Sequence, residues 1–361
     1  MIGISKLYLG TVEPSDALRY GRRSDHLPSH LLQFSQDKKP VVVWNITRQC
    51  NLKCRHCPAH APVHEFDPNW FTDMKPEVYE IVRRQLLPGL GIIHLSGGGE
   101  PFMAENLDQM LDDMVDGKRY ITVATNGTVI RLKALERLVG SPSLIRVSLD
   151  GTTNEMNQYI RGVKLDRILE FLEVLRQIRA RGAHPKFTLQ VSYVVTRSNV
   201  EQMTECVEIS HRYGVHQVCF GNFIVDSRID EFAQRESLHE HPEEVMPHWQ
   251  RAHDRGRELG VAVYPMAFNP KDQPEDEWRK QKSDLFEGDR IRICPLPWWA
   301  VYVEVDGSVK PCCVYQVPFG DLLQESFDAI WNGPKFRQLR RTVNTPAMPE
   351  TCRNCFIQER L

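Results

Sequence analysis

Three cysteines lie close together near the beginning of the chain, at Cys50, Cys54 and Cys57. Three thiolates on one loop can hold three corners of a [4Fe–4S] cluster, and because such clusters usually take four cysteines, one iron is left open for a small molecule. Zinc sites prefer four closed ligands with two residues between paired cysteines, whereas three residues separate the first pair here. The spacing therefore favours an iron–sulfur cluster with a vacant position over a zinc site or buried, inert thiols.

A second group of cysteines lies near the end of the chain. Cys294 and Cys312 flank a predicted hairpin with the turn Asp306-Gly307, and Cys352 and Cys355 form a CxxC turn. Four thiolates suit a closed iron–sulfur cluster and a structural zinc site equally well. Ligand type alone therefore leaves both kinds of metal site open.

The composition is ordinary for a globular protein but rich in cysteine. Eight of the ten cysteines fall in the two groups, and a reducing compartment favours metal ligation over disulfides. The net charge of −2 and the scattered Lys and Arg residues predict no nucleic-acid partner. No apolar run is long enough to span a bilayer, and the first residues lack the pattern of a signal peptide, so we expect a cytoplasmic protein that has no membrane partner.

Short apolar segments alternate with amphipathic ones over the first two thirds of the chain. Parallel βαβ units produce this alternation, and right-handed crossovers would curl them into a barrel. Because a complete barrel needs eight units and we find six strands, the sequence predicts an α/β fold of the partial (β/α)6 TIM barrel type. The predicted strands are 41–45, 91–95, 120–124, 144–149, 188–195 and 217–220, and the predicted helices are 76–87, 104–115, 130–139, 166–179 and 200–213.

Changes in composition divide the chain into four parts. Residues 1–40 are a polar N-terminal arm, and residues 41–235 form the predicted barrel. Residues 236–289 are charged and punctuated by proline, which indicates a helical connector. Residues 290–361 form a small C-terminal module that contains the second cysteine group.

The pattern Cys50-x3-Cys54-x2-Cys57, with the ring residue His56 before the last cysteine, resembles the motif of the radical S-adenosylmethionine (AdoMet, SAM) superfamily. The resemblance implies a partial (β/α)6 barrel, in agreement with the predicted elements. It also implies an enzyme in which the open iron binds the amino and carboxylate groups of AdoMet. Reduction of the cluster then cleaves AdoMet to methionine and a 5′-deoxyadenosyl radical, which abstracts hydrogen from a substrate, and the protein positions and shields this chemistry.

Further positions match this superfamily. Gly98, Gly99 and Glu100 resemble its GGE motif, with Gly97 as an additional glycine, and the resemblance implies that Glu100 pairs with the AdoMet ammonium group. Glycines here allow the backbone to approach a ligand closely. The other contacts to AdoMet that the resemblance implies are ribose contacts from Ser148 and Asp150, a carboxylate contact from Arg161, a nearby position for Asn126, and an adenine contact from Val195.

The C-terminal segment resembles the SPASM/twitch module of the same superfamily. The shared features are Cys294-x12-Gly307-x4-Cys312, the segments 319–322 and 326–331, and the final CxxC. Full SPASM modules carry additional cysteines for a second auxiliary cluster, and because the chain ends soon after Cys355, we expect the reduced twitch version with one auxiliary [4Fe–4S] cluster. The implied ligands are Cys294, Cys312, Cys352 and Cys355, and the neighbouring Cys313 is expected to be a bystander.

The sequence gives less information about the substrate. Single-cluster twitch enzymes include dehydrogenases of cyclitols and related sugar-like natural products, so the first expectation is oxidation of such a small molecule with help from the auxiliary cluster. The segments 28–32 and 40–45 resemble radical AdoMet proteins of haem d1 and alternative haem biosynthesis, which makes tetrapyrrole side-chain modification the alternative. Maturation of a ribosomal peptide ranks third because only 49 residues precede Cys50. An iron–sulfur electron carrier is the non-enzymatic alternative.

Candidates for contact with the substrate follow the last predicted strand, at Asn222, Asp226, Arg228 and Tyr264. The AdoMet chemistry also implies an external one-electron reductant such as flavodoxin or ferredoxin. The two isolated cysteines, Cys206 and Cys219, lie in a predicted helix and a predicted strand and are expected to be buried packing thiols.

Overall fold

The computed structural model of the chain describes residues 41–62, 68–96, 98–115, 119–223, 230–238, 241–264, 292–294, 296–343, 347–353 and 359–360. The predicted arm, much of the predicted connector, and Gly97, Asp226, Arg228 and Cys355 lie outside the described residues. Contacts between residues divide the chain into two compact units. Unit 1 comprises Met1–Trp44, Met74–Gly91 and Pro270–Leu361, and unit 2 comprises Asn45–Asp73 and Ile92–Asn269.

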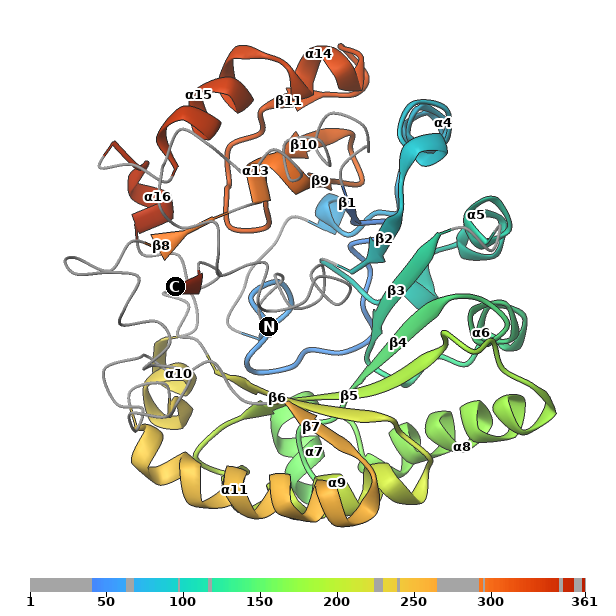
Figure 1. The fold of residues 1–361 in the computed structure, drawn as a ribbon, viewed down its shortest axis with the longest axis vertical. Coiled ribbons are helices and arrows are strands. Elements are labelled where there is room, and N and C mark those ends of the chain that lie inside the picture. Colours follow the sequence, from blue (N-terminus) through green and yellow to red (C-terminus); the bar gives the residue numbers. More distant parts are fainter. Residues whose placement is uncertain are drawn as a thin grey trace. The chain divides into compact units, whose positions relative to one another are not determined.

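Unit 2 is built on a parallel sheet, in which each strand pairs with the next along the chain. Parallel neighbours need a crossover connection, usually a helix, and the main helices of this unit lie on one side of the sheet (Figure 1). The strands are β2 (Ile92–Leu95), β3 (Tyr120–Thr125), β4 (Ser143–Ser148), β5 (Thr188–Val195), β6 (Gln217–Asn222) and β7 (Ala262–Tyr264), and these helices are α5 (Leu107–Met114), α6 (Leu132–Val139), α8 (Leu165–Arg181), α9 (Met203–Arg212) and α11 (Pro242–Leu259).

Shorter elements complete this unit and surround the ends of its strands. They are the helices α7 (Asn154–Arg161) and α10 (Asp230–Glu236) and the 3-10 turns η1 (Pro68–Trp70), η3 (Pro101–Met103) and η4 (Val200–Gln202). The strands and long helices predicted for this part of the chain are confirmed to within a few residues. The strand β7 was not predicted, because a three-residue strand is too short to show a two-residue period.

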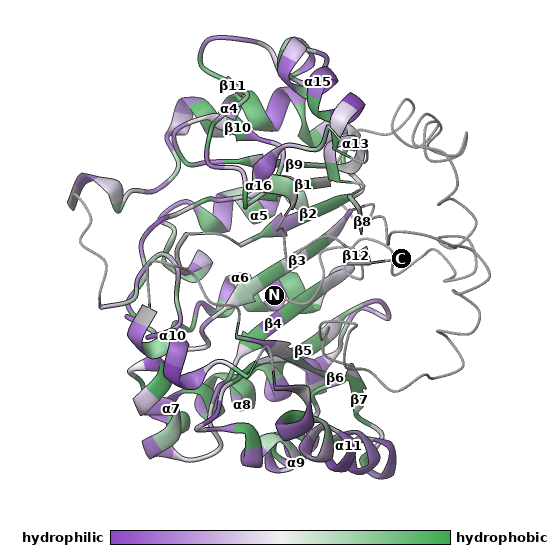
Figure 2. Ribbon diagram, turned by 90° about the vertical axis from the view of Figure 1, so that its left-hand side faces the viewer, coloured by the Kyte–Doolittle hydropathy of each residue, from purple (hydrophilic) through white to green (hydrophobic). Residues whose placement is uncertain are grey.

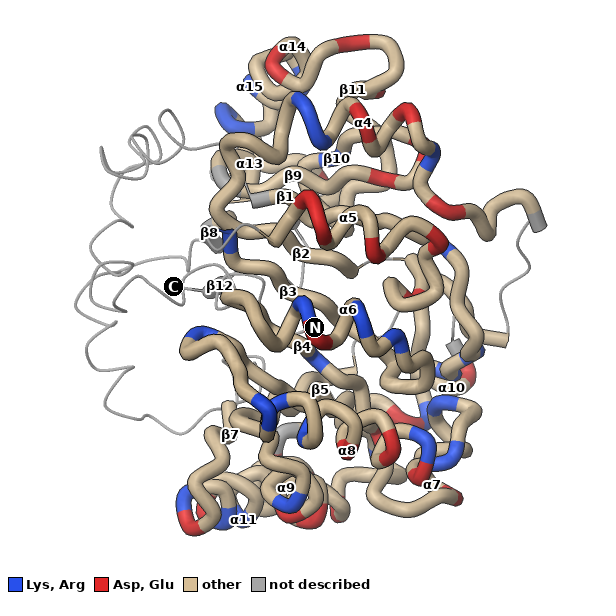
Figure 3. Tube along the Cα trace, turned by 90° about the vertical axis from the view of Figure 1, so that its right-hand side faces the viewer, with Lys and Arg blue, Asp and Glu red and all other residues tan. Residues whose placement is uncertain are grey.

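The helix α8 shows why the sequence predicted the long elements well. Its apolar residues recur every three or four positions, which places them on one stripe of a helix. The stripe Ile168, Phe171, Leu172, Leu175 and Ile178 is buried. The opposite faces of the outer helices are polar: Figure 2 shows α11 as largely hydrophilic, and Figure 3 shows acidic and basic residues intermixed on α7, α9 and α11.

The two faces of the sheet in unit 2 have different characters. On the helix side, Leu189, Val191, Tyr193 and Val195 of β5 are all buried, and the Tyr193 hydroxyl donates to the carbonyl of Asn199, just before η4. Because successive side chains of a strand point to opposite faces, the intervening residues of β5 lie on the side away from these helices, which we call the inner face.

The inner face carries a row of polar side chains across three strands. Arg146 of β4 donates from Nε to Gln190 Oε1 of β5 at 2.5 Å, and Gln190 Nε2 donates to Gln217 Oε1 of β6 at 2.8 Å. Ser148, at the end of β4, pairs in register with Ser192 on the same face. This face is therefore suited to a polar ligand rather than to packing against a helix.

Unit 1 contains the strands β1 (Val41–Trp44), β9 (Ala300–Val303), β10 (Ser308–Lys310) and β11 (Gly320–Asp321). The strand β1, predicted as the first barrel strand, forms a parallel ladder with β9. The predicted hairpin is confirmed: β9 and β10 pair antiparallel, and Gly307 in the turn has a φ of 94°, which favours glycine. The helical elements of unit 1 are α4 (Pro76–Gln85), η2 (Leu87–Gly89), α13 (Leu296–Trp299), α14 (Phe327–Trp331), α15 (Pro334–Thr342) and α16 (Glu350–Arg353), and β8 (Arg292–Ile293) pairs with β12 (Glu359–Arg360).

An aromatic contact joins β1 to α4 within unit 1. The rings of Trp44 and Tyr79 stack with centroids 5.7 Å apart, and Trp44 Nε1 donates to the sulfur of Met74 at 2.9 Å. Trp44 is fully buried.

None of the described helices combines the length and the apolarity that a membrane span requires.

The fully buried Asn199 is expected to be important for the stability of unit 2. Its Nδ2 donates to the carbonyls of Asp150 and Val194, each at 2.9 Å, and its Oδ1 accepts from the Thr196 amide at 2.7 Å. The change Asn199→Ala leaves these buried backbone groups without their partner, so we expect the free energy of unfolding to fall by about 2–4 kcal/mol. Chemical denaturation followed by circular dichroism measures this loss.

A matched control is Asn154→Ala, which removes an exposed contact to Asp166. Exposed contacts of this kind contribute little to stability, so the control should lower the free energy of unfolding by less than about 0.5 kcal/mol. Equal losses in the two variants would contradict a special role for Asn199.

Candidate functional site

The loop that carries the first cysteine group is held by two other segments of unit 2. The amide of Glu100 donates to the carbonyl of Gln49 at 2.7 Å, and the amide of Arg55 donates to the carbonyl of Ile160, near the end of α7, at 2.9 Å. These bonds fix the loop on both sides of Cys50 and Cys54. The cysteine triplet, the GGE-like segment and α7 are therefore neighbours in unit 2.

The three cysteines are free thiols in a largely enclosed place. Cys54 is buried, while Cys50 and Cys57 are half-buried, and the Cys57 sulfur accepts from the amides of Ala59 at 3.4 Å and His60 at 3.3 Å. Burial raises the pKa of Cys54 to about 12 and also raises the pKa of Cys50. Because thiolates bind iron, the positive charge of the metal must compensate this burial, and three such thiols on one loop fit three corners of a four-iron cluster.

Gly99 is required by the close crossing of the GGE-like segment and the cysteine loop. A Cβ atom at Gly99 would lie 2.3 Å from the carbonyl oxygen of Gln49 and 2.8 Å from the carbonyl carbon of Arg48. At Gly98 the nearest atom would be Asn45 Nδ2, at 3.2 Å. The glycine at position 99 therefore serves the contact between two loops, in addition to any approach to a ligand.

The carboxylate of Glu100 is held by hydrogen bonds within unit 2. Its carboxylate accepts from the Asn126 amide at 2.6 Å, the Thr125 hydroxyl at 2.8 Å and the Phe102 amide at 3.1 Å. Burial raises the pKa of Glu100, and the amides of Asn126 and Phe102 counteract this rise. Only 2% of the residue is exposed, and these bonds tie the GGE-like segment to the end of β3. The pairing of Glu100 with the AdoMet ammonium group stays a prediction.

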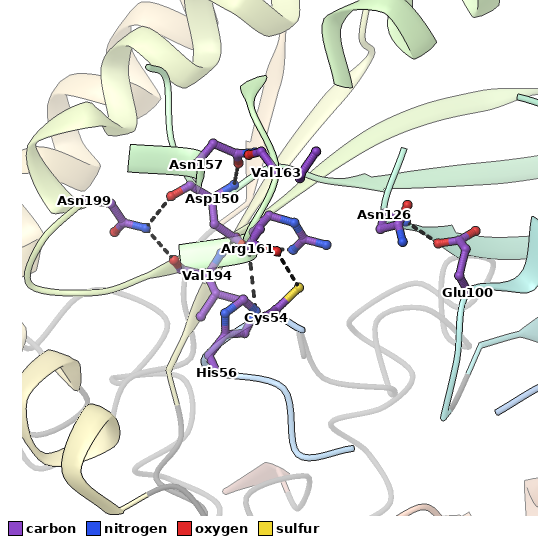
Figure 4. A network of polar contacts seen from close by, with 10 residues as sticks. All are labelled: Cys54, His56, Glu100, Asn126, Asp150, Asn157, Arg161, Val163, Val194 and Asn199. Atoms are coloured by element: carbon purple, nitrogen blue, oxygen red, sulfur yellow. Dashed lines mark hydrogen bonds and ion pairs between the residues drawn. The ribbon is translucent and has the colours of Figure 1, made fainter. Parts of the chain in front are cut away.

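Asp150 is also an internal acceptor, as Figure 4 shows. Its Oδ2 accepts from Arg161 Nη1 at 2.6 Å and lies 3.5 Å from His56 Nε2, while its Oδ1 accepts from the Val194 amide at 2.7 Å. Asp150 is fully buried. The carboxylate thus positions Arg161, His56 and β5, and its ribose contact stays a prediction.

Two buried polar atoms beside the cysteine loop lack a hydrogen-bond partner among the described residues. They are Nε of Arg161 and Nδ1 of His56. Arg161 lies next to the loop, since its carbonyl is 3.6 Å from the sulfur of Cys54. Burial lowers the pKa of His56 to about 4, so the ring is neutral at pH 7. A buried donor and a neutral ring nitrogen without partners fit a polar ligand such as AdoMet, whose carboxylate Arg161 is predicted to bind.

The remaining predicted AdoMet contacts lie at strand ends of unit 2. Ser148 is half-buried on the inner face. Val195 lies on the helix side and is 1% exposed, whereas Val194, which is half-buried, shares the face of Ser148. An adenine contact from the inner face would therefore come from Val194 rather than Val195. Asn126 lies beside Cys50, with 3.8 Å between its Nδ2 and the sulfur.

The predicted substrate contacts are placed only in part. Asn222 is half-buried at the end of β6, and the next residue, Phe223, packs edge-on against the ring of His56 with centroids 6.1 Å apart. Tyr264 is 37% exposed at the end of β7, and no described contact links it to the cysteine loop. Sequence reasoning missed His60, which contacts the Gly98 carbonyl; its position three residues after Cys57 was the available signal.

The second cysteine group comes together in unit 1. Cys294, Cys312 and Cys313 pack against Leu296 and Ala300. Cys294 also packs on a second small core that includes Cys352. Burial raises the pKa of Tyr315, and the nearby Cys352 and Cys312 raise it further. Three of the four predicted ligands, Cys294, Cys312 and Cys352, therefore share one region, and Cys313 lies there too.

Comparison with known proteins gives two domain matches. The profile of the Radical SAM superfamily matches residues 44–208, and that of the SPASM iron–sulfur cluster-binding domain matches residues 294–356. The fold is similar to that of Streptococcus suis SuiB bound to S-adenosylmethionine, with a TM-score of 0.64 and 16% sequence identity over 98% of this chain and 82% of SuiB.

Two kinds of proteins are similar to this chain in sequence: synthases of tetrapyrroles and a biosynthesis protein of the bacteriocin subtilosin. The chain is 36% identical to the Fe-coproporphyrin III synthase of Methanosarcina barkeri over 71% of this chain and 63% of that protein. It is 24% identical to the pre-heme d1 synthase of Dinoroseobacter shibae over 84% and 76% of the two chains. It is also 22% identical to the subtilosin biosynthesis protein AlbA of Bacillus subtilis over 86% and 63%. The chain thus spans 63% of the first and third of these relatives.

We expect Gly99→Ala to disturb the first metal site, because the added methyl group would meet the backbone of Gln49 and Arg48. The cysteine loop would have to move, so the iron content of the first site should fall and AdoMet binding should weaken roughly tenfold or more, which corresponds to about 1.4 kcal/mol. Iron analysis and an AdoMet titration measure the two effects. Gly98→Ala is the matched control and should be milder, since a side-chain amide can shift; equal losses would argue against the backbone crossing.

Anaerobically prepared protein is expected to hold about eight iron atoms, from two four-iron clusters. Cys312→Ser should remove about four of them, and Cys313→Ser should leave the total near eight, because the spacing Gly307-x4-Cys312 favours Cys312 as the ligand. Iron, sulfide and zinc analysis of the three proteins gives the answer. About four irons with one zinc in the parent protein would identify the C-terminal site as a zinc site instead.

Proposed function

Because this chain is a member of the radical SAM superfamily with a C-terminal SPASM domain, we propose that it is an enzyme that modifies a tetrapyrrole of the iron-coproporphyrin type. Its cofactors are AdoMet and two [4Fe–4S] clusters. When bound to the reduced first cluster, AdoMet supplies a 5′-deoxyadenosyl radical that removes a hydrogen atom from the substrate. The observation that supports this substrate class most strongly is the 36% identity to an Fe-coproporphyrin III synthase over 71% of the chain.

This proposal corrects the order of substrate classes expected from the sequence. A cyclitol or sugar-like substrate was the first expectation, and none of the relatives above supports it. The tetrapyrrole alternative fits better, because the relatives include both an Fe-coproporphyrin III synthase and a pre-heme d1 synthase. A location in the cytoplasm and an electron donor such as flavodoxin or ferredoxin remain predictions.

The residues around the cysteine loop would divide the work of holding AdoMet. Arg161, fixed by Asp150 at 2.6 Å, would donate its partnerless Nε–H to the AdoMet carboxylate. The ring of His56, positioned by the same Asp150, would face AdoMet with Nδ1 as a hydrogen-bond acceptor, since the Nε2 side is directed to a carboxylate. Glu100 and Gly99 would act indirectly by holding the two loops together.

The inner face of unit 2 would hold the tetrapyrrole. Tetrapyrroles of this type carry carboxylate side chains, and Arg146 places a positive charge on this face. Its Nε–H is directed at Gln190, whose amide is fixed in turn by Gln217. A guanidinium held in a defined plane binds carboxylates well, so we assign Arg146 to one substrate carboxylate.

A peptide substrate is the second candidate. The observation in its favour is the similarity to the subtilosin biosynthesis protein over 86% of this chain. The same AdoMet site would serve that reaction, and the difference would lie in the groups that bind the substrate.

An anaerobic assay with a chemical reductant distinguishes these candidates. We expect iron coproporphyrin-type tetrapyrroles, and not ribosomal precursor peptides, to increase the formation of 5′-deoxyadenosine and to change in mass. Arg146→Gln should weaken tetrapyrrole binding roughly tenfold, about the 1.4 kcal/mol of one charged hydrogen-bonded contact, and leave AdoMet cleavage without substrate unchanged. The control Arg176→Gln alters an exposed pair with Glu173 on α8 and should change neither value. Turnover of a peptide alone would overturn the tetrapyrrole assignment.

A further inference from the structure

The hydrogen atoms of the Asn126 side chain can be assigned from its neighbours. Its Oδ1 accepts from the backbone amide of Thr128 at 2.9 Å and from the Thr128 hydroxyl at 2.7 Å. A backbone N–H can only donate, so the atom facing it must be the carbonyl oxygen of the Asn126 amide. The NH2 group of Asn126 therefore points the other way.

That NH2 group has two acceptors on the cysteine loop. Asn126 Nδ2 lies 2.9 Å from Asn51 Oδ1 and 3.8 Å from the sulfur of Cys50. The orientation of Asn51 follows from that of Asn126: the Thr128 hydroxyl donates its proton to Asn126 Oδ1, so the Asn51 atom that lies 2.8 Å from this hydroxyl is the donor Nδ2. The Thr128 hydroxyl then accepts from Asn51 and donates to Asn126, so each donor in this circuit meets an acceptor.

The backbone of Asn126 is fixed as well. Its amide donates to Glu100 Oε2 at 2.6 Å, and Asn126 is 6% exposed. The side chain therefore approaches Cys50 from a rigid support at the end of β3 rather than from a mobile loop.

We propose that Asn126 is a positioning residue that donates an N–H hydrogen bond to the Cys50 thiolate and thereby makes the first cluster easier to reduce. A hydrogen bond to a ligating sulfur withdraws negative charge and favours the reduced, more negative cluster, so it raises the reduction potential. The step concerned is the transfer of one electron from an external one-electron reductant to the cluster, before AdoMet is cleaved. The proposal depends on Cys50 being a cluster ligand and on no particular substrate.

The hydrogen-bond contacts to the sulfur of Cys50 differ from those to the sulfurs of Cys54 and Cys57. The Cys57 sulfur accepts from backbone amides, of Ala59 and His60, which substitution leaves in place. The Cys54 sulfur faces a carbonyl, that of Arg161. The Cys50 sulfur accepts from the backbone amide of Leu52 and also from the side chain of Asn126. The contact from Asn126 is the one that a substitution can remove without changing the loop.

The test is a redox titration followed by electron paramagnetic resonance, with the first cluster identified by its response to AdoMet. Asn126→Ala removes the donor without adding charge, and Asn126→Asp keeps the acceptor for Thr128 but places an oxygen near the sulfur. We expect each change to shift the equilibrium of the first cluster toward the oxidised form by roughly tenfold or more, which is 59 mV for a one-electron couple. If Asn126→Asp holds less iron than the parent protein, the reduction potential of Asn126→Ala decides the test.

The matched control is Asn51→Ala, which opens the same circuit but removes no donor from the Cys50 sulfur. The reduction potential of the first cluster in this variant should equal that in the parent protein. Iron content and circular dichroism should be unchanged in all variants that are compared. An unchanged potential in Asn126→Ala overturns the proposal. An equal shift in Asn51→Ala and Asn126→Ala also overturns it, because the circuit would then act through loop structure alone.

Discussion

The carboxylate of Glu100 lies out of reach of solvent, and a buried charge is tolerated only where hydrogen-bond donors surround it. Its donors come from Phe102, Thr125 and Asn126, and its own amide donates to Gln49. One residue thus joins the cysteine loop, the GGE-like segment and the end of β3. The direction in which Asn126 faces Cys50 depends on this junction, and so does the close crossing at Gly99.

A second buried carboxylate organises the other side of the loop by the same physical rule. Asp150 accepts from Arg161 and from the amide of Val194, which joins α7 to β5. The resemblance to radical AdoMet enzymes implies ligand contacts for both carboxylates, and in the structure their oxygens accept hydrogen bonds from inside the protein. Groups that remain for a ligand are those whose hydrogen bonds are incomplete, such as Nε of Arg161 and Nδ1 of His56.

Periodicity predicted the elements of this fold and could not predict their partners. The apolar stripe of α8, the strands of unit 2 and the turn at Gly307 follow from local patterns that a single segment contains. The ladder between β1 and β9 joins residues far apart in the chain, so no local pattern reveals it. A shift of one residue exchanges the faces of a strand, which is why Val195 was assigned a contact that the inner face would offer through Val194. The side-chain partners of Asn199 include Asp150 from a distant segment of the chain, and only the folded chain brings the two segments together.

The correction of the substrate class has a related cause. The expected cyclitol substrate rested on the number of cysteines in the C-terminal module, and those cysteines are predicted to hold a cluster in unit 1. The groups that would contact a substrate lie elsewhere, on the inner face of unit 2, where Arg146, Gln190 and Gln217 form one hydrogen-bonded row. The set of clusters and the choice of substrate are therefore determined by different residues, and the first can change without the second. A cationic and amide-lined face suits a ligand with carboxylate side chains, as a tetrapyrrole has, better than it suits an uncharged cyclitol.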